Sequence, residues 1–387
     1  MFLEFLYKNI VESFNTKISY GSFECPLLIL QMVMWCVGGL LIYLAIKKDM
    51  EPTLLLPMGF GAILVNLPFS GAVGEGAPLT TLFNAGIANE LFPLLLFIGI
   101  GAMIDFAPIL QNPKLMLFGA AAQFGIFMTF SLASLFFSTE AAASIGIIGA
   151  ADGPTAIVVG QALLAGTSDS NILGAIMVAA YSYMALVPII QPPIIKLCTT
   201  KKERLIRMQY KGRKVTKLTK ILFPIFVTII AGLIAPESVA LVGFLMFGNL
   251  IRECGVLDNL SDTAQHVLAN LVTIFLGITI ATKMEASAFL AVETLLVIGL
   301  GLFAFIFDTA GGVMFAKLYN VFAKDKINPM IGAAGISAFP MSGRVVHKMG
   351  LKEDPQNFLL MHSMAVNVSG QIASVIAGGL ILSFFGA

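Results

Sequence analysis

An aspartate, Asp152, stands inside an apolar segment that extends from Ala142 to Leu164. A charged side chain at membrane depth costs about 2.5–3.5 kcal/mol on insertion scales, so carboxylates found there are functional by default. The next two residues, Gly153 and Pro154, interrupt a helix, because glycine frees φ and proline removes a backbone donor. The pattern therefore predicts a functional carboxylate beside a break in a membrane helix.

The groups next to this carboxylate are all oxygens. Broken backbone at membrane depth is tolerated only in a cavity or inside the protein, because lipid cannot satisfy freed N–H and C=O groups. A carboxylate, loose carbonyls and the Thr155 hydroxyl suit a hard cation or a proton. We therefore expect an intramembrane cation site that includes Asp152 and Thr155. The alternative is a buried, neutral aspartate with the structural role of capping a half-helix.

A second polar cluster lies toward the carboxyl end. The glycine- and proline-rich stretch Asn328–Arg344 carries Ser337, and a later apolar segment carries Asn367, Gln371 and Ser374. Because the last three recur at i, i+4 and i+7, they share one face of a helix. Such a face either joins helices by hydrogen bonds or, taken with the whole cluster, completes the ion site.

Three further features each have more than one interpretation. Arg344 either anchors the chain at the cytoplasmic surface or holds an anion that approaches from that side. Tyr181 and Tyr183 stand well inside the segment Ile172–Ile195, whereas tyrosines usually lie at a membrane interface. A phenol at that depth needs a partner, and it can relay a proton or bind an ion. Asp308 is a second intramembrane acid.

Composition defines the class of protein. Hydrophobic residues make up 58% of the 387 and charged residues 12%, whereas soluble domains carry about 25% charged residues. The four cysteines and three histidines show no spacing typical of a metal site. The sequence therefore predicts an all-α polytopic membrane protein. Its apolar segments are Pro26–Ile46, Thr53–Pro68, Leu91–Leu110, Leu115–Phe137, Ala142–Leu164, Ile172–Ile195, Ile221–Ala235, Val239–Ile251, Val267–Ala281, Ala288–Leu318, Pro329–Met341 and Leu359–Phe385.

The distribution of charge orients these segments. Residues 196–220 hold ten Lys or Arg against one Glu, so this linker is expected in the cytoplasm, as is the Lys47-Lys48 pair. Five apolar segments lie between the two marks, and an odd number puts the linker on the wrong side. A re-entrant hairpin at Ala142–Leu164 removes the conflict. In the second half, the basic stretches Lys317–Lys326 and Arg344–Lys352 both lie in the cytoplasm only if Pro329–Met341, between them, is re-entrant as well.

Short motifs recur in the two halves of the chain, at offsets of 178, 184 and 183 residues. They pair Phe97-Ile-Gly99 with Phe275-Leu-Gly277, Gly59-Phe60…Asn66-Leu67 with Gly243-Phe244…Asn249-Leu250, and Gly149-Ala-Ala-Asp152 with Gly332-Ala-Ala-Gly335. The first half begins outside and the second inside, which predicts an inverted-topology repeat whose two broken hairpins meet at the membrane midplane. The predicted division is an amphipathic segment 1–25, a first repeat 26–195, the linker 196–220 and a second repeat 221–387.

These motifs resemble the beta subunits of the sodium-translocating biotin-dependent decarboxylases. The matching stretches are Phe97–Phe106, Gly149–Ile157, Tyr181–Pro193, Asn328–Arg344 and Asn367–Gly370. The resemblance covers nearly the whole chain from Gly38 onward, while the first thirty residues match nothing obvious.

The resemblance implies a specific activity. In that family a carboxyltransferase (alpha) subunit moves CO2 from an organic acid or acyl-CoA to biotin on a carrier subunit. This chain is then expected to decarboxylate carboxybiotin with uptake of a proton and to export Na+. The resemblance also implies a small membrane subunit as partner, a homotrimer with scaffold and transport parts, and the bacterial cytoplasmic (inner) membrane. The acid stays open among oxaloacetate, methylmalonyl-CoA, glutaconyl-CoA and malonate, because the partner subunit recognises it.

The same resemblance suggests roles for individual residues. Asp152 matches the main sodium-site carboxylate, and Asn367 matches an ion-site partner. Tyr183 or Tyr181, which the motif does not separate, is expected in the ion and proton path. The expected catalytic residues are Asp152, Tyr183, Ser337 and Arg344; those at carboxybiotin are Arg344 and Asn328; and those around sodium are Asp152, Thr155, Asn367, Ser369 and Ser337.

Transport of a cation against the membrane potential needs a source of energy. Moving one charge against 100 mV requires about 2.3 kcal/mol, so the chain needs a chemical driver or a second gradient. The sequence contains no phosphate-binding G-x-x-x-x-G-K-[ST] loop and no Met-Lys-Met for biotin attachment, so we expect biotin on another subunit. Sodium and a proton would then compete for one site. The rival hypotheses are a stand-alone secondary carrier (a Na+/H+ antiporter or organic-anion symporter) and a non-transporting membrane anchor, which leaves the polar midplane unexplained.

Overall fold

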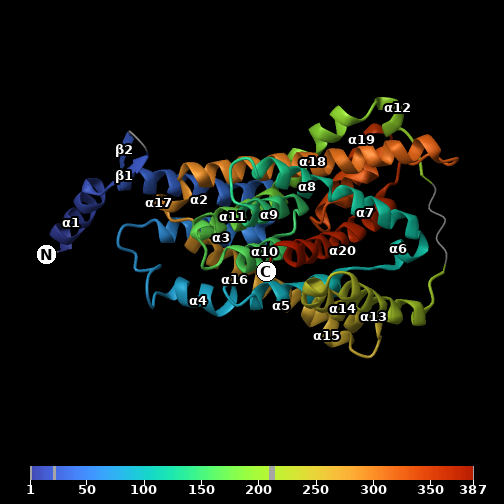
Figure 1. Ribbon diagram of the computed structural model, residues 1–387, viewed down its shortest axis with the longest axis horizontal. Coiled ribbons are helices and arrows are strands. Elements are labelled where there is room, and N and C mark those ends of the chain that lie inside the picture. The colour runs from blue at the N-terminus through green and yellow to red at the C-terminus, as the bar shows by residue number, and fades with distance from the viewer. Residues whose placement is uncertain (1, 21–22, 209–213, 387) are drawn as a thin grey trace.

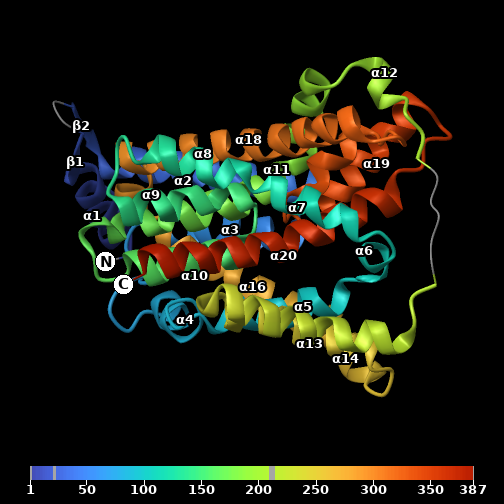
Figure 2. The same cartoon turned by 45° about the vertical axis from the view of Figure 1, so that its right-hand side comes forward.

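A computed structural model describes residues 2–20, 23–208 and 214–386. The remaining residues include part of the predicted amphipathic segment (1 and 21–22) and part of the predicted linker (209–213), which therefore lie outside the described residues. The described chain is helical apart from one short hairpin, and most helices run along a common long axis (Figures 1 and 2).

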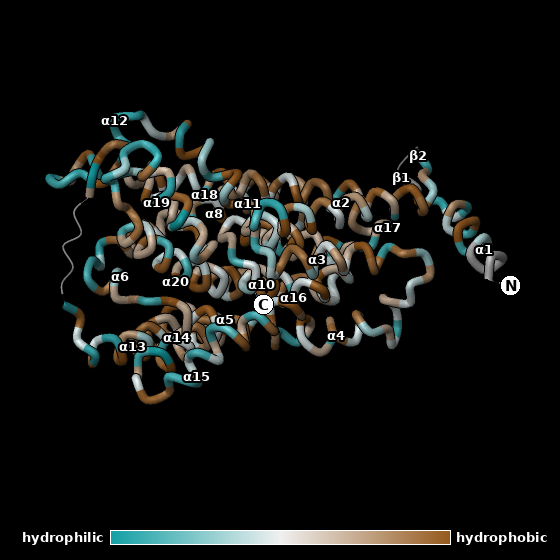
Figure 3. Tube along the Cα trace, turned by 180° about the vertical axis from the view of Figure 1, so that it is seen from behind, coloured by the Kyte–Doolittle hydropathy of each residue, from teal (hydrophilic) through white to brown (hydrophobic). Residues whose placement is uncertain are grey.

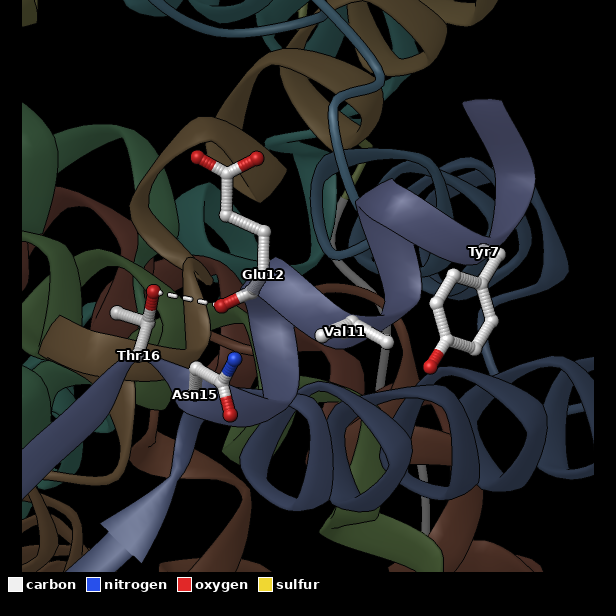
Figure 4. A pocket seen from close by; sticks show the side chains of 5 residues that line it. All are labelled: Tyr7, Val11, Glu12, Asn15 and Thr16. Carbon is white, nitrogen blue, oxygen red and sulfur yellow. Dashed lines mark hydrogen bonds between the residues drawn. The ribbon is translucent and has the colours of Figure 1, made fainter. Parts of the chain in front are cut away.

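The amino-terminal elements lie at one end of the molecule (Figure 1). They are α1 (Phe2–Asn15), β1 (Lys17–Tyr20) and β2 (Phe23–Pro26), and the two strands pair antiparallel. A hollow on α1 is lined by Tyr7, Val11, Glu12, Asn15 and Thr16, where the Thr16 hydroxyl donates to the backbone carbonyl of Glu12 (Figure 4). Because one helix and its exit supply every lining residue, this hollow encloses no site.

Seven helices of the described part are long and apolar enough to cross a membrane. They are α2 (Leu27–Lys48), Pro113–Ala133, Ser168–Cys198, α13 (Lys217–Ile234), Asp258–Lys283, α18 (Val292–Phe322) and α20 (Leu360–Phe385). An eighth span results if α4 (Pro78–Gly86) and α5 (Leu91–Met103), which are bent by 62°, count as one. Hydrophilic residues concentrate in the connections and helix ends, and hydrophobic ones along the helices (Figure 3). The chain is thus a nearly all-helical multi-pass membrane protein, as predicted.

Several spans are built from consecutive short helices. In the first half the further elements are α3 (Pro52–Val65), α6 (Ala107–Gln111), η1 (Pro113–Leu115), α7 (Met116–Ala122), α8 (Phe124–Ala133), α9 (Thr139–Gly146), η2 (Ile147–Ala150), α10 (Gly153–Leu164), η3 (Ser168–Ile172), α11 (Leu173–Cys198) and α12 (Lys201–Arg204). In the second half they are η4 (Pro236–Ser238), α14 (Val239–Glu253), α15 (Asp258–Asp262), η5 (Thr263–Leu268), α16 (Ala269–Ile280), η6 (Ala281–Lys283), α17 (Ala286–Phe289), η7 (Pro329–Gly335) and α19 (Met341–Glu353).

Both segments predicted to be re-entrant are broken. In the first, α9 continues into the 3-10 turn η2, the chain turns at Ala151 with φ 52°, and α10 then packs beside α9. The break therefore precedes Gly153 and Pro154. These residues begin α10, where the missing N–H of proline costs nothing, instead of ending a helix as the sequence suggested. In the second segment, η7 is followed by irregular residues and then by α19, which packs against it.

The order of elements corresponds between the halves. The series α2, α3, α5, α8, α9–α10 and α11 parallels the series α13, α14, α16, α18, η7–α19 and α20. The packing is reciprocal as well, because α5 packs against α14 and α16 packs against α3. A side chain at Gly101 would overlap the Leu245 carbonyl, and one at Gly248 would overlap the Ile98 carbonyl, so these backbones touch. This pattern agrees with a repeat, and the inverted relation of the halves stays a prediction.

The apolar interior forms two clusters. The smaller is built mainly from α2, α3, α4 and α16, and the larger mainly from α7 to α11, α14 and α18 to α20. The helix α11 belongs to both, since Ile176 and Ala180 face the larger cluster while Met177 and Tyr181 face the smaller. The helices α5, α13 and α14 lie together along one side of the molecule (Figures 1 and 2).

Candidate ion-binding site

Asp152 lies at the break between η2 and α10 and is only 3% exposed. The backbone N–H of Thr155 donates to Oδ1 at 3.4 Å, and the Thr155 hydroxyl donates to Oδ2 at 2.8 Å. This is the geometry of an N-cap residue, and the positive end of the helix dipole favours a negative charge there. The first turn of α10 therefore holds the carboxylate, as the alternative capping interpretation also required.

Two side chains of α20 hold the same carboxylate. The Gln371 amide and the Ser374 hydroxyl each donate to Oδ2 of Asp152 at 3.0 Å. Gln371 and Ser374 thus share the face of α20 that the sequence predicted, although both were absent from the predicted ligand set. Oδ2 receives three hydrogen bonds from described residues, whereas Oδ1 receives only the longer one from Thr155, so Oδ1 keeps acceptor capacity.

The second broken segment meets the first at this point. The Ser337 N–H donates to the Ala150 carbonyl at 3.1 Å, which joins the two breaks directly. The Ser337 hydroxyl donates to the Gly370 carbonyl at 3.0 Å, and the Asn367 amide donates to the Ile336 carbonyl at 2.7 Å. The prediction that the two broken segments come together is therefore confirmed, and α20 joins them.

A cavity of about 230 Å³ adjoins the carboxylate. Asp152, Tyr181, Ser337 and Gln371 contribute to one wall, and side chains of α3, α5 and α16 form the other. The Tyr181 hydroxyl and the Asn367 Oδ1 are buried without a hydrogen-bond partner among the described residues. Apart from the Gln371 amide, the polar side chains on the first wall present oxygens, which suits a hard cation.

The two tyrosines of α11 face different surroundings. The Tyr181 ring packs on Gly153, where any side chain would overlap it, and lines the cavity with Asp152. The Tyr183 hydroxyl instead donates to the Ile298 carbonyl in α18. Residues two apart on a helix do not share a face, so only one of them reaches the carboxylate. The predicted role of Tyr183 in the ion and proton path stays a prediction, and the structure places it away from Asp152.

Three other predicted residues lie outside this cluster or at its edge. The Asn328 amide donates to the carbonyls of Arg204 and Ile206 at 2.8 and 2.9 Å, so it ties η7 to the basic linker. The Ser369 hydroxyl donates to the carbonyls of Leu115 and Val366, on the side of α20 that faces α7. Arg344 is exposed on α19, one turn beyond the cavity-lining residue Pro340. Their predicted roles stay predictions.

The basic linker is tied to the end of α19. Arg204 forms an ion pair with Glu353 at 2.8 Å, and Arg207 forms one with Asp354 at 2.5 Å. The hydrogen bond from Arg207 holds the pKa of the Asp354 carboxyl below its usual value. These contacts hold α12, which belongs to the linker, and the residues that follow it beside α19 at one end of the molecule (Figure 1).

The fold and the site together define a multi-pass membrane protein with a buried carboxylate between two broken helical segments. The chain belongs to the family of Na+-transporting oxaloacetate decarboxylase beta subunits, whose family model matches residues 30–385. The resemblance found in the motifs is therefore confirmed.

Curated relatives cover nearly the whole chain. It is 50% identical over 380 residues to the methylmalonyl-CoA decarboxylase subunit beta of Propionigenium modestum. The aligned region covers 92% of this chain and 95% of the relative. It is 49% identical over 355 residues to the glutaconyl-CoA decarboxylase subunit beta of Acidaminococcus fermentans (92% and 93%). It is 45% identical over 418 residues to the oxaloacetate decarboxylase beta chain of Klebsiella pneumoniae (92% and 95%). This chain is accordingly a membrane subunit of a multi-subunit decarboxylase.

Proposed function

We propose that this chain decarboxylates carboxybiotin with uptake of a proton and couples that reaction to the export of Na+. The observation that carries the proposal is the Asp152 carboxylate, buried where two broken segments meet, held by Thr155, Gln371 and Ser374, and adjoining a cavity. A purely structural cap needs the hydrogen bonds but not the cavity beside them. The names of the relatives support a decarboxylase as the driver of transport.

The chemistry balances with one proton. The bond between the carboxyl carbon and the ring nitrogen of the carboxylated biotin breaks, CO2 leaves, and the electron pair on nitrogen takes up a proton. We assign Arg344, exposed on α19, to the substrate carboxylate before the bond breaks. When a proton leaves Asp152 its carboxylate is free to bind Na+, and when Na+ leaves a proton can return. Competition for one carboxylate is then the coupling between the reaction and transport.

The proposed partners follow from the same relatives. The three relatives belong to decarboxylases named for three different acids, and yet they are 50%, 49% and 45% identical to this chain. Similar identity to subunits that serve different acids is expected when another subunit selects the acid. We therefore propose a carboxyltransferase (alpha) subunit as the partner that selects the acid, and, on the family resemblance, a biotin carrier and a small membrane subunit as further partners. We further propose a homotrimer in the bacterial cytoplasmic (inner) membrane, with scaffold and transport parts.

Reconstitution in liposomes with free carboxybiotin tests the proposal. We expect loss of carboxybiotin that Na+ stimulates, together with Na+ movement across the bilayer. Sodium flux driven by a pH gradient without any turnover of carboxybiotin would instead favour the stand-alone secondary carrier. If the protein showed neither turnover of carboxybiotin nor flux of Na+, only the role of a membrane anchor would remain, and the proposal would be contradicted.

Removing one donor to the carboxylate should weaken the use of sodium. In Ser374→Ala we expect the Na+ concentration for half-maximal turnover to rise at least about 10-fold. The reason is that the lost hydrogen bond stabilises the ionised carboxyl that binds Na+ over the protonated one, and a hydrogen bond to a charged group contributes roughly 1.5–3 kcal/mol. Ser369→Ala is the matched control, since this serine of the same helix bonds carbonyls away from Asp152. Equal shifts in the two variants, measured from the Na+ dependence of carboxybiotin loss, would contradict the assignment and would restore Ser369 as a predicted ligand.

A further inference from the structure

The cavity beside Asp152 contains a second carboxylate, Glu51, which neither the motif analysis nor the hydrogen-bond cluster assigns to the site. Glu51 lies in the turn between α2 and α3, three residues after the Lys47-Lys48 pair that is predicted to lie on the cytoplasmic side. It lines the cavity together with Asp152. The two acids belong to different parts of the molecule, because α3 packs in the smaller apolar cluster and Asp152 lies beside the larger one.

The backbone at Glu51 is unusual for a glutamate. Its φ of 38° lies in the left-handed region, which costs a residue with a side chain on the order of 1–3 kcal/mol. The following residue is Pro52, and proline further disfavours helical conformations in the residue before it. Glycine or asparagine would fit this turn at lower cost. Asp49 in the same turn also has a positive φ, of 52°, so what distinguishes Glu51 from it is the place of Glu51 in the cavity lining.

The charge of Glu51 has one opposing neighbour. Burial raises the pKa of the Glu51 carboxyl, the positive charge of Arg344 lowers it, and the negative charge of Asp49 raises it. In the part of the chain that the structure describes, no hydrogen bond or ion pair holds this carboxylate. The acid thus faces the cavity within electrostatic range of the arginine that we assign to the substrate carboxylate, without being bound to it.

The remaining polar side chains of the cavity come from the wall opposite Asp152. Thr53 of α3 and Asn270 and Thr273 of α16 present hydroxyl or amide oxygens, and the intervening lining of α5 is apolar. Asn270 and Thr53 are exposed, so this side of the cavity reaches the protein surface. Apolar walls strengthen the field of a carboxylate on a mobile cation, because charges in a cleft of low dielectric constant are poorly screened.

We propose that Glu51 is the carboxylate through which cations pass from the cytoplasm to Asp152, and that an anion held by Arg344 releases Glu51 for this task. With Arg344 uncompensated, its positive charge opposes a cation near Glu51. A substrate carboxylate on Arg344 cancels that charge and leaves Glu51 as the net charge at the mouth of the cavity. Sodium then enters when the substrate is in place. The inference rests on the proposed function and adds an order of binding to it.

The test compares the Na+ dependence of carboxybiotin loss in reconstituted Glu51→Gln with that of the unchanged protein. Glutamine keeps the shape and removes the charge. We expect the half-saturating Na+ concentration to rise about 10-fold, the lower end of the range by which charged clefts accelerate association, while kcat at saturating Na+ changes less than twofold. Glu51→Asp should recover part of the loss.

Asp49→Asn is a stringent control, because this exposed acid acts electrostatically on Glu51 from two residues away but does not line the cavity, so a clearly smaller shift is expected. An equal shift in Asp49→Asn would reduce the effect to general surface charge and overturn the inference. A lower rate of carboxybiotin loss in Glu51→Gln at every Na+ concentration, without a shift in the half-saturating Na+ concentration, would overturn it as well.

A second measurement separates this inference from the proposed function. Equilibrium Na+ binding without carboxybiotin should be lost in Asp152→Asn and retained in Glu51→Gln. If the unchanged protein neither binds Na+ nor responds to it, the proposed function itself fails. If it binds and responds but Glu51→Gln behaves like the unchanged protein in turnover, only the role of Glu51 fails.

Discussion

Replacement of Asp152 by asparagine should abolish the stimulation of carboxybiotin decarboxylation by Na+. The substitution keeps the side-chain shape and an acceptor for Gln371 and Ser374, but it removes the charge next to the cavity. At an effective dielectric constant of about 20, a unit charge about 4 Å from a cation contributes roughly 4 kcal/mol. That energy corresponds to a loss of affinity of the order of a thousandfold, so no Na+ response should remain at attainable concentrations.

The control for this variant is Asp169→Asn. Asp169 is an acid beyond the far end of α10 that accepts a hydrogen bond from the Ser138 hydroxyl at the start of α9. We expect Asp169→Asn to keep its Na+ response, and both variants to unfold at temperatures close to that of the unchanged protein in detergent. A full Na+ response in folded Asp152→Asn would contradict the site.

The second large effect should follow from Gly370→Ala. A Cβ at this position would overlap the backbone carbonyl of Gly335, so α20 and η7 could not keep their present contact. Inserting a methyl group into such packing typically costs about 1–3 kcal/mol, and a displacement of about 1 Å near a site can lower activity 100-fold. We expect a lower unfolding temperature and a loss of Na+-stimulated turnover of that order.

Gly299→Ala provides the comparison, because a Cβ on this residue of α18 meets no atom. Alanine is favoured over glycine in a helix by about 1 kcal/mol, so this variant should be at least as stable as the unchanged protein. Wild-type stability and turnover in Gly370→Ala would show that the two broken segments tolerate separation from α20, contrary to our description of the site.

Much of the architecture was predictable because membrane helices obey few rules. Long apolar segments must form helices or lie inside the protein, so the spans agree with the predicted segments to within a few residues at most ends. The break near Asp152 was also predictable, since glycine, proline and a charge coincide there. The break lies before Gly153 and not at Gly153-Pro154 as predicted, because proline can also begin a helix. The conformation of Ala151, which makes the turn, has no signal in residue type.

The site was predictable where one helix carries the information. Thr155 follows Asp152 at the spacing of a cap, and Asn367, Gln371 and Ser374 share a face by helical period alone. The environment of Tyr183 and the partners of Asn328 depend on α18 and on the basic linker, which are distant in sequence. Glu51 precedes Asp152 by about a hundred residues, and only the tertiary fold brings both carboxylates to one cavity. Residue types cannot reveal such long-range contacts.

The central claim is that Na+ and a proton compete for the Asp152 carboxylate, and proton release on Na+ binding tests it most directly. Sodium chloride would be added to the purified chain in weakly buffered solution with a pH indicator, and choline chloride would serve as the salt control. The account predicts that Na+ releases protons from the unchanged protein and none from Asp152→Asn. Sodium binding without proton release, or release that persists in Asp152→Asn, would contradict it.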